Sequence, residues 1–284
     1  MAKMCLIDLE GTLVGNEFFI ELARLRGKES TAQEFTELAM SGSMGLEVAI
    51  QKRLGLVKGL PKQDVEALLS NVKFNEGAFE LVASLKGAGF EIAIVTGGFS
   101  VFADEIARRL GISRVFANEL IFNDGVLEGA NATVKKGMLA KMFAENGAGV
   151  LAIGDGANDI EMFMESSAAF ALGSRSAVVK NADLSFSSLS EIASAVKKPF
   201  YLATSDCSLP RLKGNVIHFS DSKGLERKIG IADVLIVRNQ KIDSAIMDKA
   251  PNLRLIIRQG IGVDNIDQAY ATHKGIAVFN TPLS

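Results

Sequence analysis

The sequence predicts an α/β protein made of two parallel-sheet units, the first of which contains an inserted bundle of helices. Short apolar runs alternate with segments of helix length along most of the chain, the pattern of parallel sheets wrapped by helices. The stretch 16–71 differs, because its apolar residues recur only at helical spacing. The composition changes near residue 198, since both histidines, both tyrosines and four of the five prolines follow it. We therefore expect a first unit over 1–198 and a second over 199–284.

The composition is that of an ordinary globular protein. The chain has 284 residues, 48% of them hydrophobic, and a net charge of −2, which leaves no basic field for nucleic acid. No apolar run approaches the ~18 residues of a membrane span. The two cysteines lie in separate units, a usage typical of core thiols in a reducing compartment. We expect a cytoplasmic protein without nucleic-acid or membrane partners, and the sequence leaves a homodimer open.

The elements of the first unit follow in a regular order. An apolar strand over 4–8 comes first, and the helical stretch 16–71 follows it. The turn Asn123-Asp124-Gly125 between two short strands is typical of a β-hairpin. Two weaker strand–helix pairs complete the unit before residue 198. The other expected elements are helices over 76–86, 101–110 and 134–146 and strands over 90–95 and 150–153.

The second unit repeats the strand–helix alternation on a smaller scale, so we expect a smaller, flavodoxin-like α/β module. A dinucleotide-binding fingerprint is excluded at Gly260-Ile261-Gly262, because Asn265 stands where the third glycine is required. The expected strands are 201–203, 216–219, 234–237, 253–257 and 276–279.

Three strands of the first unit are followed by residues suited to chemistry, namely Asp8, Thr96 and Asp155. Parallel sheets bind ligands at the carboxyl ends of their strands. The first unit has no histidine, which excludes Ser–His–Asp catalysis and His-ligated zinc. If the strand ends are adjacent, Asp8, Glu10, Asp155 and Asp159 crowd one crevice and need a cation to neutralise them. Oxygen ligands alone suit Mg²⁺ held together with a substrate phosphate.

These residue types indicate phosphoryl transfer from a small phosphomonoester. A carboxylate such as Asp8 can attack phosphorus and form an aspartyl-phosphate intermediate. Glu10 can protonate the leaving oxygen and later deprotonate the attacking water. Lys136 has an alternative interpretation as a surface lysine at the start of a helix, like its neighbour Lys135. The donors expected to hold the phosphoryl oxygens are Thr96, Gly97, Lys136 and Asn158.

The segments DLEGT at 8–12, TGGF at 96–99 and GDGAND at 154–159, with Lys136 between the last two, resemble the motifs of the haloacid-dehalogenase-like phosphatases. They are most similar to the forms found in phosphoserine phosphatases. The resemblance covers residues 1 to about 197. It implies a Rossmann-like core over 1–14 and 74–198, a helical cap over 15–73, and Mg²⁺-dependent hydrolysis of O-phospho-L-serine to L-serine and phosphate.

The same resemblance implies roles for individual residues. Asp8 would be the nucleophile and a Mg²⁺ ligand, together with the main-chain carbonyl of Glu10 and with Asp155, while Asp159 would orient metal-bound water and Lys136. In the cap, Glu17 would pair with the substrate amino group and Arg53 with its carboxylate. Glu17 and Arg53 could equally be solvated helix charges. Two further residues would line the substrate pocket, Met40 and Leu46.

Glu10 departs from the family pattern, in which most members have aspartate. Glutamate at this position is similar to the phosphoserine:homoserine phosphotransferases, which transfer the phosphoryl group to an alcohol instead of water. The longer side chain moves the acid/base group by roughly 1 Å. The sequence therefore leaves two hypotheses for the acceptor of the phosphoryl group, water or an alcohol.

The second unit resembles the amino-terminal substrate domain of the 2-hydroxyacid dehydrogenases, in particular D-3-phosphoglycerate dehydrogenases. The likeness rests on the segments IADVLIVR at 231–238 and RQGIGVDN at 258–265. It implies that Arg238, Arg258 and Gly260 contact a substrate phosphate or carboxylate. The family's nucleotide-binding domain and catalytic residues have no counterpart in this chain, so we expect no hydride transfer. An alternative reading is a truncated bifunctional fusion whose second module only binds ligand.

Overall fold

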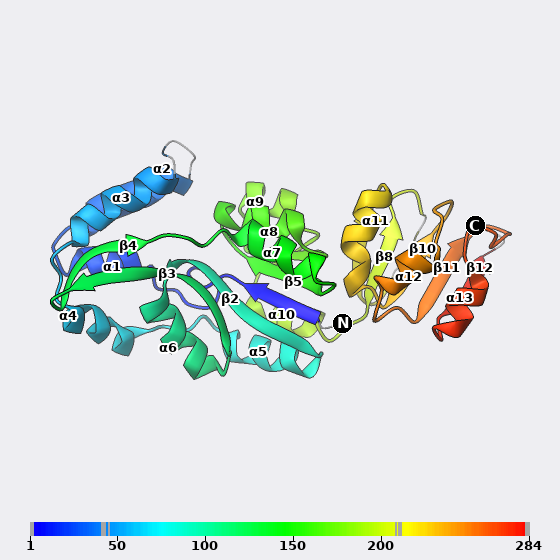
Figure 1. The fold of residues 1–284 in the computed structure, drawn as a ribbon, viewed down its shortest axis with the longest axis horizontal. Helices are drawn as coiled ribbons and strands as arrows, with labels where there is room; N and C mark the ends of the chain where they lie inside the picture. Colours follow the sequence, from blue (N-terminus) through cyan, green and yellow to red (C-terminus); the bar gives the residue numbers. More distant parts are fainter. Residues whose placement is uncertain (1–2, 41–43, 45, 208, 210–211, 282–284) are drawn as a thin grey trace.

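The computed structural model describes residues 3–40, 44, 46–207, 209 and 212–281. They form two separate β-sheets, one of seven strands and one of five. Figure 1 shows the smaller sheet at one end of an elongated molecule, a group of helices at the other end, and the larger sheet between them. The predicted α/β class with two parallel-sheet cores is confirmed.

The larger sheet has the strand order β4-β3-β2-β1-β5-β6-β7. All neighbours pair in parallel except β3 and β4, which form the predicted hairpin. Without the antiparallel β4, this is the Rossmann order, whose topological switch point lies between β1 and β5. The strands are β1 (Lys3–Ile7), β2 (Phe90–Phe99), β3 (Arg114–Asn123), β4 (Val126–Asn131), β5 (Gly149–Gly154), β6 (Ala168–Leu172) and β7 (Leu184–Phe186).

Helices cover both faces of this sheet, which explains why its central strands are continuously apolar. Successive side chains of a strand point to opposite faces. Accordingly, Cys5 and Ile7 of β1 belong to one buried cluster, and Met4 and Leu6 belong to another. The helices of this unit are α5 (Ala78–Gly87), α6 (Ser100–Leu110), α7 (Lys136–Glu145), α8 (Ile160–Glu165), α9 (Ser176–Asn181) and α10 (Leu189–Ala195).

Several strands differ from their expected bounds by one or two residues, and β2 differs by four. β2 continues to Phe99, so Thr96, Gly97 and Gly98 lie within the strand and do not follow it as predicted. The pairing of β2 with β3 shifts register between Val95 and Phe99. At this irregularity the backbone of β2 stays extended, but its regular pairing with β3 is interrupted.

The helical insert lies between β1 and α5, as predicted. We refer to it as the cap. Its base pairs with the β3–β4 hairpin: the Gly59 N–H donates to the Leu127 carbonyl, and the Leu127 N–H donates to the Leu60 carbonyl, both over 2.8 Å. The cap consists of α1 (Phe18–Arg24), α2 (Glu29–Met40), α3 (Leu46–Val57), α4 (Lys62–Ala67) and a 3₁₀ turn, η1 (Leu68–Asn71).

The smaller sheet has the order β12-β11-β10-β8-β9, with every pair parallel. Counted along this unit alone, the order is 2-1-3-4-5 from the β9 edge, which is the flavodoxin-like arrangement. The predicted division of the chain at residue 198 falls between α10 and β8. The elements are β8 (Phe200–Thr204), β9 (Asn215–Phe219), α11 (Ser222–Lys228), η3 (Ile229–Ile231), β10 (Val234–Val237), α12 (Ser244–Asp248), β11 (Leu255–Gln259), α13 (Gln268–His273) and β12 (Ala277–Thr281).

The two units meet where strands of both sheets begin, and we call this contact the unit interface. The Phe200 ring, at the start of β8, lies 6.4 Å from that of Phe90 at the start of β2 and stacks on Phe170. The backbones of Gly149 and Gly230 approach so closely that a Cβ on Gly149 would lie 2.3 Å from the Gly230 carbonyl oxygen. Buried residues of both units form one hydrophobic cluster. The interface is therefore part of the core.

No helix among the described residues combines the length and the apolar character needed to span a bilayer.

Candidate active site

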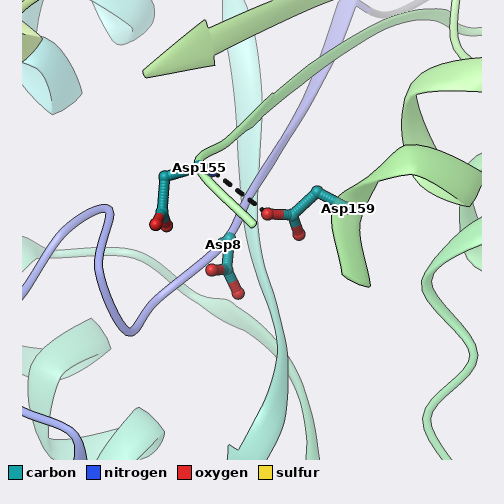
Figure 2. A group of neighbouring side chains, drawn as sticks. All are labelled: Asp8, Asp155 and Asp159. Carbon is teal, nitrogen blue, oxygen red and sulfur yellow. Dashed lines mark hydrogen bonds between the residues drawn. The ribbon is translucent and has the colours of Figure 1, made fainter. Parts of the chain in front are cut away.

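Three aspartates gather at the carboxyl ends of the two strands that flank the switch point. Asp8 directly follows β1, and its N–H donates to the Ile153 carbonyl of β5 over 2.9 Å. Asp155 directly follows β5, and Asp159 ends the short turn η2 (Ala157–Asp159) after it. One carboxylate oxygen from each aspartate lies within 4.8 Å of the others. Figure 2 shows the three side chains converging on one space.

Lys136, the first residue of α7, joins two of these carboxylates. Its ammonium donates to Asp8 Oδ1 over 2.5 Å and to Asp159 Oδ1 over 2.6 Å. The side chain is only 6% exposed, so the structure does not place it on the surface. Burial alone would lower the pKa of Lys136, but Asp8 and Asp159 outweigh burial and raise it above its ordinary value. Lys136 therefore stays charged and holds one oxygen of Asp8, leaving the other free.

Asp159 has little capacity left for a metal. Its Oδ2 accepts the N–H groups of Asp155 and Gly156 over 3.1 and 3.0 Å, while Oδ1 binds Lys136. These bonds fix the loop that presents Asp155. Asp159 thus holds this loop in place. Lys136 leaves one oxygen of Asp8 free, and the oxygens of Asp155 accept one hydrogen bond each, from Thr12 and Arg175.

Without a bound cation, the negative charge of these carboxylates is only partly balanced by neighbouring groups. The pKa of Asp8 is raised well above its ordinary value, first by burial and then by Asp159. Burial is also the main cause that raises the pKa of Asp155, against the hydroxyl of Thr12, which donates to Asp155 Oδ1 over 2.9 Å. A cluster of oxygen donors with excess negative charge fits a hard divalent cation such as Mg²⁺. The residues present therefore fit the predicted metal.

Gly11 is the residue that lets this cluster form. Its φ of +83° lies in the left-handed region, which glycine adopts at no steric cost. A Cβ at Gly11 would lie 2.6 Å from Asp155 Oδ1, so any other residue would displace the carboxylate. Glycine is thus required at position 11 for two reasons, the backbone conformation of the turn after β1 and the closeness of Asp155.

Glu10 extends from the same turn toward the cap. Its Oε1 accepts the N–H of Phe18, the first residue of α1, over 2.8 Å. A Cβ at Gly98 would lie 3.1 Å from Glu10 Oε2, so the carboxylate reaches the end of β2. Burial, followed by the charge of Glu17, raises the pKa of Glu10 to about 7. A group with such a pKa can both donate and accept a proton near neutrality, as acid–base catalysis requires.

The predicted phosphate donors lie on three elements of the first unit, β2, η2 and α7. Thr96 is buried near the end of β2, and its hydroxyl oxygen accepts the Gly98 N–H over 2.9 Å. Gly97 is exposed, as is Asn158, which lies in η2 between two of the aspartates. Whether they bind phosphate together stays a prediction.

In the cap, Glu17 and Arg53 lie within electrostatic reach of Glu10. Burial lowers the pKa of Arg53, while Glu10 and Glu17 act in the opposite direction. The Arg53 guanidinium lies 4.8 Å from the centre of the Phe19 ring, and its buried Nε has no hydrogen-bond partner among the described residues. This position argues against a solvated charge at Arg53. Glu17 is exposed at the start of α1. Outside the described side chains lie Met40 and Leu46.

Sequence reasoning missed Arg175. Its Nη1 donates to Asp155 Oδ2 over 2.9 Å and to the Asp155 carbonyl over 3.2 Å. Arg175 follows β6, the neighbour of β5, so the strand-end rule applied to the next strand could have identified it. It adds a positive charge beside the carboxylates.

In the second unit, the three predicted anion-binding residues lie after or within neighbouring strands. Arg238 follows β10, and its carbonyl accepts the Nε–H of Arg258 of β11 over 3.1 Å. A Cβ on Gly260 would collide with the Arg258 guanidinium, which shows how closely the two approach. The structure therefore brings Arg238, Arg258 and Gly260 together at the carboxyl ends of β10 and β11, on one edge of the smaller sheet.

A Rossmann-ordered sheet with a helical cap and a carboxylate cluster at the switch point defines a phosphoryl-transfer type of hydrolase. The haloacid dehalogenase-like hydrolase model matches residues 2–165 of this chain. The model of the D-isomer specific 2-hydroxyacid dehydrogenase catalytic domain matches residues 199–284. The chain belongs to the haloacid dehalogenase-like hydrolase family, and its carboxyl-terminal region is similar to a second family.

Curated relatives of the first unit are phosphatases. The phosphoserine phosphatase of Archaeoglobus fulgidus is 36% identical over 208 residues, covering 69% of this chain and 60% of the relative. That of Methanocaldococcus jannaschii is 35% identical over 191 residues, covering 64% of this chain and 90% of the relative. The first unit is therefore a phosphatase enzyme.

Solved structures agree. One described as a phospho-aspartyl intermediate analogue of phosphoserine phosphatase has a TM-score of 0.64 and 34% identity, covering 68% of this chain and 98% of that one. DsGPDH of Dunaliella salina covers 98% of this chain and 62% of its own, with a TM-score of 0.60. At 19% identity, this second match shows a shared fold alone.

Proposed function

We propose that the first unit hydrolyses O-phospho-L-serine to L-serine and phosphate in the presence of Mg²⁺. The observation that carries the proposal is the cluster of Asp8, Asp155 and Asp159, two of which, Asp8 and Asp159, bind the Lys136 ammonium. The phosphoserine phosphatases among its relatives support the substrate, and the phospho-aspartyl analogue structure supports the intermediate. Mg²⁺ would be held by the Asp8 and Asp155 carboxylates and the Glu10 main-chain carbonyl, and would neutralise charge on the transferring group.

In the first step, Asp8 Oδ2 attacks phosphorus, because Lys136 occupies Oδ1. The bond from phosphorus to the serine oxygen breaks, and protonated Glu10 gives its proton to that oxygen. In the second step, ionised Glu10 takes a proton from water, whose oxygen attacks the phosphorus of the aspartyl phosphate. Phosphate leaves and Asp8 is regenerated. Thr96, Gly97, Lys136 and Asn158 hold the phosphoryl oxygens throughout.

The decisive test is phosphate release from O-phosphoserine by Asp8→Asn. An amide cannot act as the nucleophile, so we expect turnover to fall on the order of 10³-fold or more. Asp64→Asn, an equivalent change on the exposed surface of α4, is the matched control and should leave turnover unchanged. Activity retained by Asp8→Asn would rule out the proposed nucleophile.

Recognition of the serine moiety is assigned to Arg53 and Glu17, whose charges face Glu10. Arg53→Lys keeps the charge but loses the planar fork that binds a carboxylate through two bonds. We expect KM for O-phosphoserine to rise about tenfold at nearly unchanged kcat. KM of Arg53→Lys for phenyl phosphate, which has no carboxylate, should not change. Lys52→Ala, a variant of the exposed neighbour on α3, should leave KM unchanged for both substrates. Equal effects on both substrates would contradict the assignment.

Phosphoryl transfer to an alcohol is the second candidate, and Glu10 is the residue that favours it. Incubation with O-phosphoserine and homoserine separates the two readings by product: free phosphate for a hydrolase, O-phosphohomoserine for a transferase. We expect phosphate release to dominate. A yield of O-phosphohomoserine that exceeds released phosphate would replace hydrolysis by transfer.

For the second unit, we propose binding of a small phosphate- or carboxylate-bearing ligand by Arg238, Arg258 and Gly260. The support is their common position at one sheet edge and the match to the dehydrogenase family. Calorimetric titration with 3-phosphoglycerate should give saturable binding that Arg238→Met abolishes. Equal binding by the wild type and by Arg238→Met would show that the ligand does not bind at this edge of the sheet.

We also infer a cytoplasmic location. Cys5 and Cys207 are free thiols, and Cys5 is fully buried. Unpaired thiols are typical of reducing compartments.

A further inference from the structure

Asn118 connects two elements of the proposed phosphate site without facing the substrate. It lies on β3 and is only 3% exposed. Its Nδ2 donates to the Gly97 carbonyl over 2.8 Å, and its Oδ1 accepts the N–H groups of Thr133 and Val134 over 2.9 and 3.0 Å. One buried amide thus makes three hydrogen bonds to two segments that are distant in sequence.

On one side, Asn118 fixes the peptide plane between Gly97 and Gly98. The carbonyl oxygen of this plane binds Asn118, and its N–H donates to the Thr96 hydroxyl oxygen over 2.9 Å. The Thr96 hydroxyl takes part in this bond only as an acceptor, so its proton remains available to donate elsewhere. The orientation of Thr96 and Gly97, both proposed phosphate donors, therefore depends on a plane that Asn118 holds.

On the other side, Asn118 anchors the chain that leads into α7. Residues 132–135 form neither helix nor strand, and Lys136 follows them as the first residue of α7. With the N–H groups of Thr133 and Val134 bound to one oxygen, this irregular segment has a defined position. The Lys136 ammonium reaches Asp8 from that position.

We propose that Asn118 is a positioning residue. It sets the distance between the donors on β2 and the Lys136 ammonium so that both can bind the same phosphoryl group. This role rests on the proposed function of the site. Displacement of a positioned group by about 1 Å costs on the order of 100-fold in rate. Asn118 acts through its neighbours, since it contributes no atom to the reacting group.

The test variant is Asn118→Asp, which keeps the shape and the acceptor for Thr133 and Val134 but replaces the donor to Gly97 by an oxygen. Asn215→Asp is the matched control. Asn215 is equally buried, at 3% exposed, and its Nδ2 also donates to main-chain carbonyls, those of Ala195 and Lys198. Both variants lose a buried donor, but only one lies beside the phosphate site.

Two measurements on the Mg²⁺-loaded full chain decide the question: kcat and KM for O-phosphoserine, and the affinity for inorganic phosphate by calorimetry. We expect Asn118→Asp to lower kcat about 100-fold and phosphate affinity about 10-fold. Asn215→Asp should lower the melting temperature to a similar extent but leave both site parameters unchanged. Asn118→Ala, which admits water in place of the amide, provides the same readout if the aspartate variant does not fold.

Unchanged phosphate affinity and kcat in a folded Asn118 variant would overturn the proposal, as would an equal kinetic loss in Asn215→Asp. Failure of the proposed function has a different signature. In that case the wild-type protein would not hydrolyse O-phosphoserine at all, while the phosphate affinity of the variants would still report on the position of the donors.

Discussion

At the residue scale, the site concentrates charge that the fold itself does not neutralise. Asp8 and Asp155 are partly or fully buried, and the pKa of each is raised above its ordinary value, chiefly by burial. Lys136 and Arg175 bind these carboxylates, but oxygen atoms of three aspartates remain within 4.8 Å of one another. Function therefore opposes stability at this point, as is common at catalytic sites.

This conflict predicts the stability of Asp8→Asn. A carboxyl whose pKa is raised in the folded state stabilises the protein only when protonated, so ionised Asp8 costs stability at neutral pH. In EDTA at pH 7, we expect Asp8→Asn to raise the melting temperature by about 3 °C. Mg²⁺ should stabilise the wild type and have little effect on the variant. A lower melting temperature of the variant in EDTA would contradict this account.

At the element scale, the turn after β1 decides the geometry of the site. Gly11 combines a φ of +83° with a position at which a Cβ would lie 2.6 Å from Asp155 Oδ1. The same chain region enters the cap, whose base is tied to β4 by main-chain hydrogen bonds. The turn therefore has to satisfy the metal site and the cap entrance at once.

Gly11→Ala is expected to weaken Mg²⁺ binding at least about tenfold, because the new methyl group displaces Asp155. Gly27→Ala is the matched control, since Gly27 also has a positive φ, +64°, but no atom lies within 4 Å of its Cβ position. Both variants should lose about 1 kcal/mol of stability from the strained backbone. Calorimetric titration with Mg²⁺ separates them, and equal affinities would show that the contact with Asp155 is unimportant.

At the scale of the whole molecule, the unit interface joins two folds that the sequence presents as separate. Phe200 stacks in the core of the first unit, and Lys228 of the second unit forms an ion pair with Asp183 of the first. The Phe200 N–H also donates to Asp233 over 2.9 Å, and Asp233 lies 3.8 Å from the Lys3 ammonium. An interface with shared core and buried polar bonds favours cooperative unfolding of both units.

The tyrosines make this cooperativity measurable. The chain has no tryptophan, and Tyr201 and Tyr270 lie in the second unit, so tyrosine fluorescence reports on that unit alone. Ile106→Val removes one fully buried methyl group from α6 of the first unit, away from the interface. We expect it to lower the tyrosine melting transition by about 3 °C, from a loss of about 1 kcal/mol. Ile121→Val, the same change at an exposed position of β3, should have no effect.

If Ile106→Val shifts the circular dichroism transition but leaves the tyrosine transition in place, the two units unfold independently.

The amino-acid sequence alone is enough to predict the class of fold and the class of chemistry. Its alternation of apolar strands and helices identified both parallel sheets, because burial on both faces imposes a pattern that local sequence records. Strand-end motifs identified Asp8, Thr96 and Asp155 as candidates, since ligands bind at that edge of any parallel sheet.

The partners of those candidate residues depend on how the whole chain packs. Lys136 and Asp8 are 128 positions apart, and the contact of Arg175 with Asp155 and the three bonds of Asn118 likewise join distant segments. The unit interface and the added length of β2 depend on packing and strand pairing in the same way. Local sequence encodes what a segment can bury, whereas the distance between two side chains is fixed only when the whole core has packed.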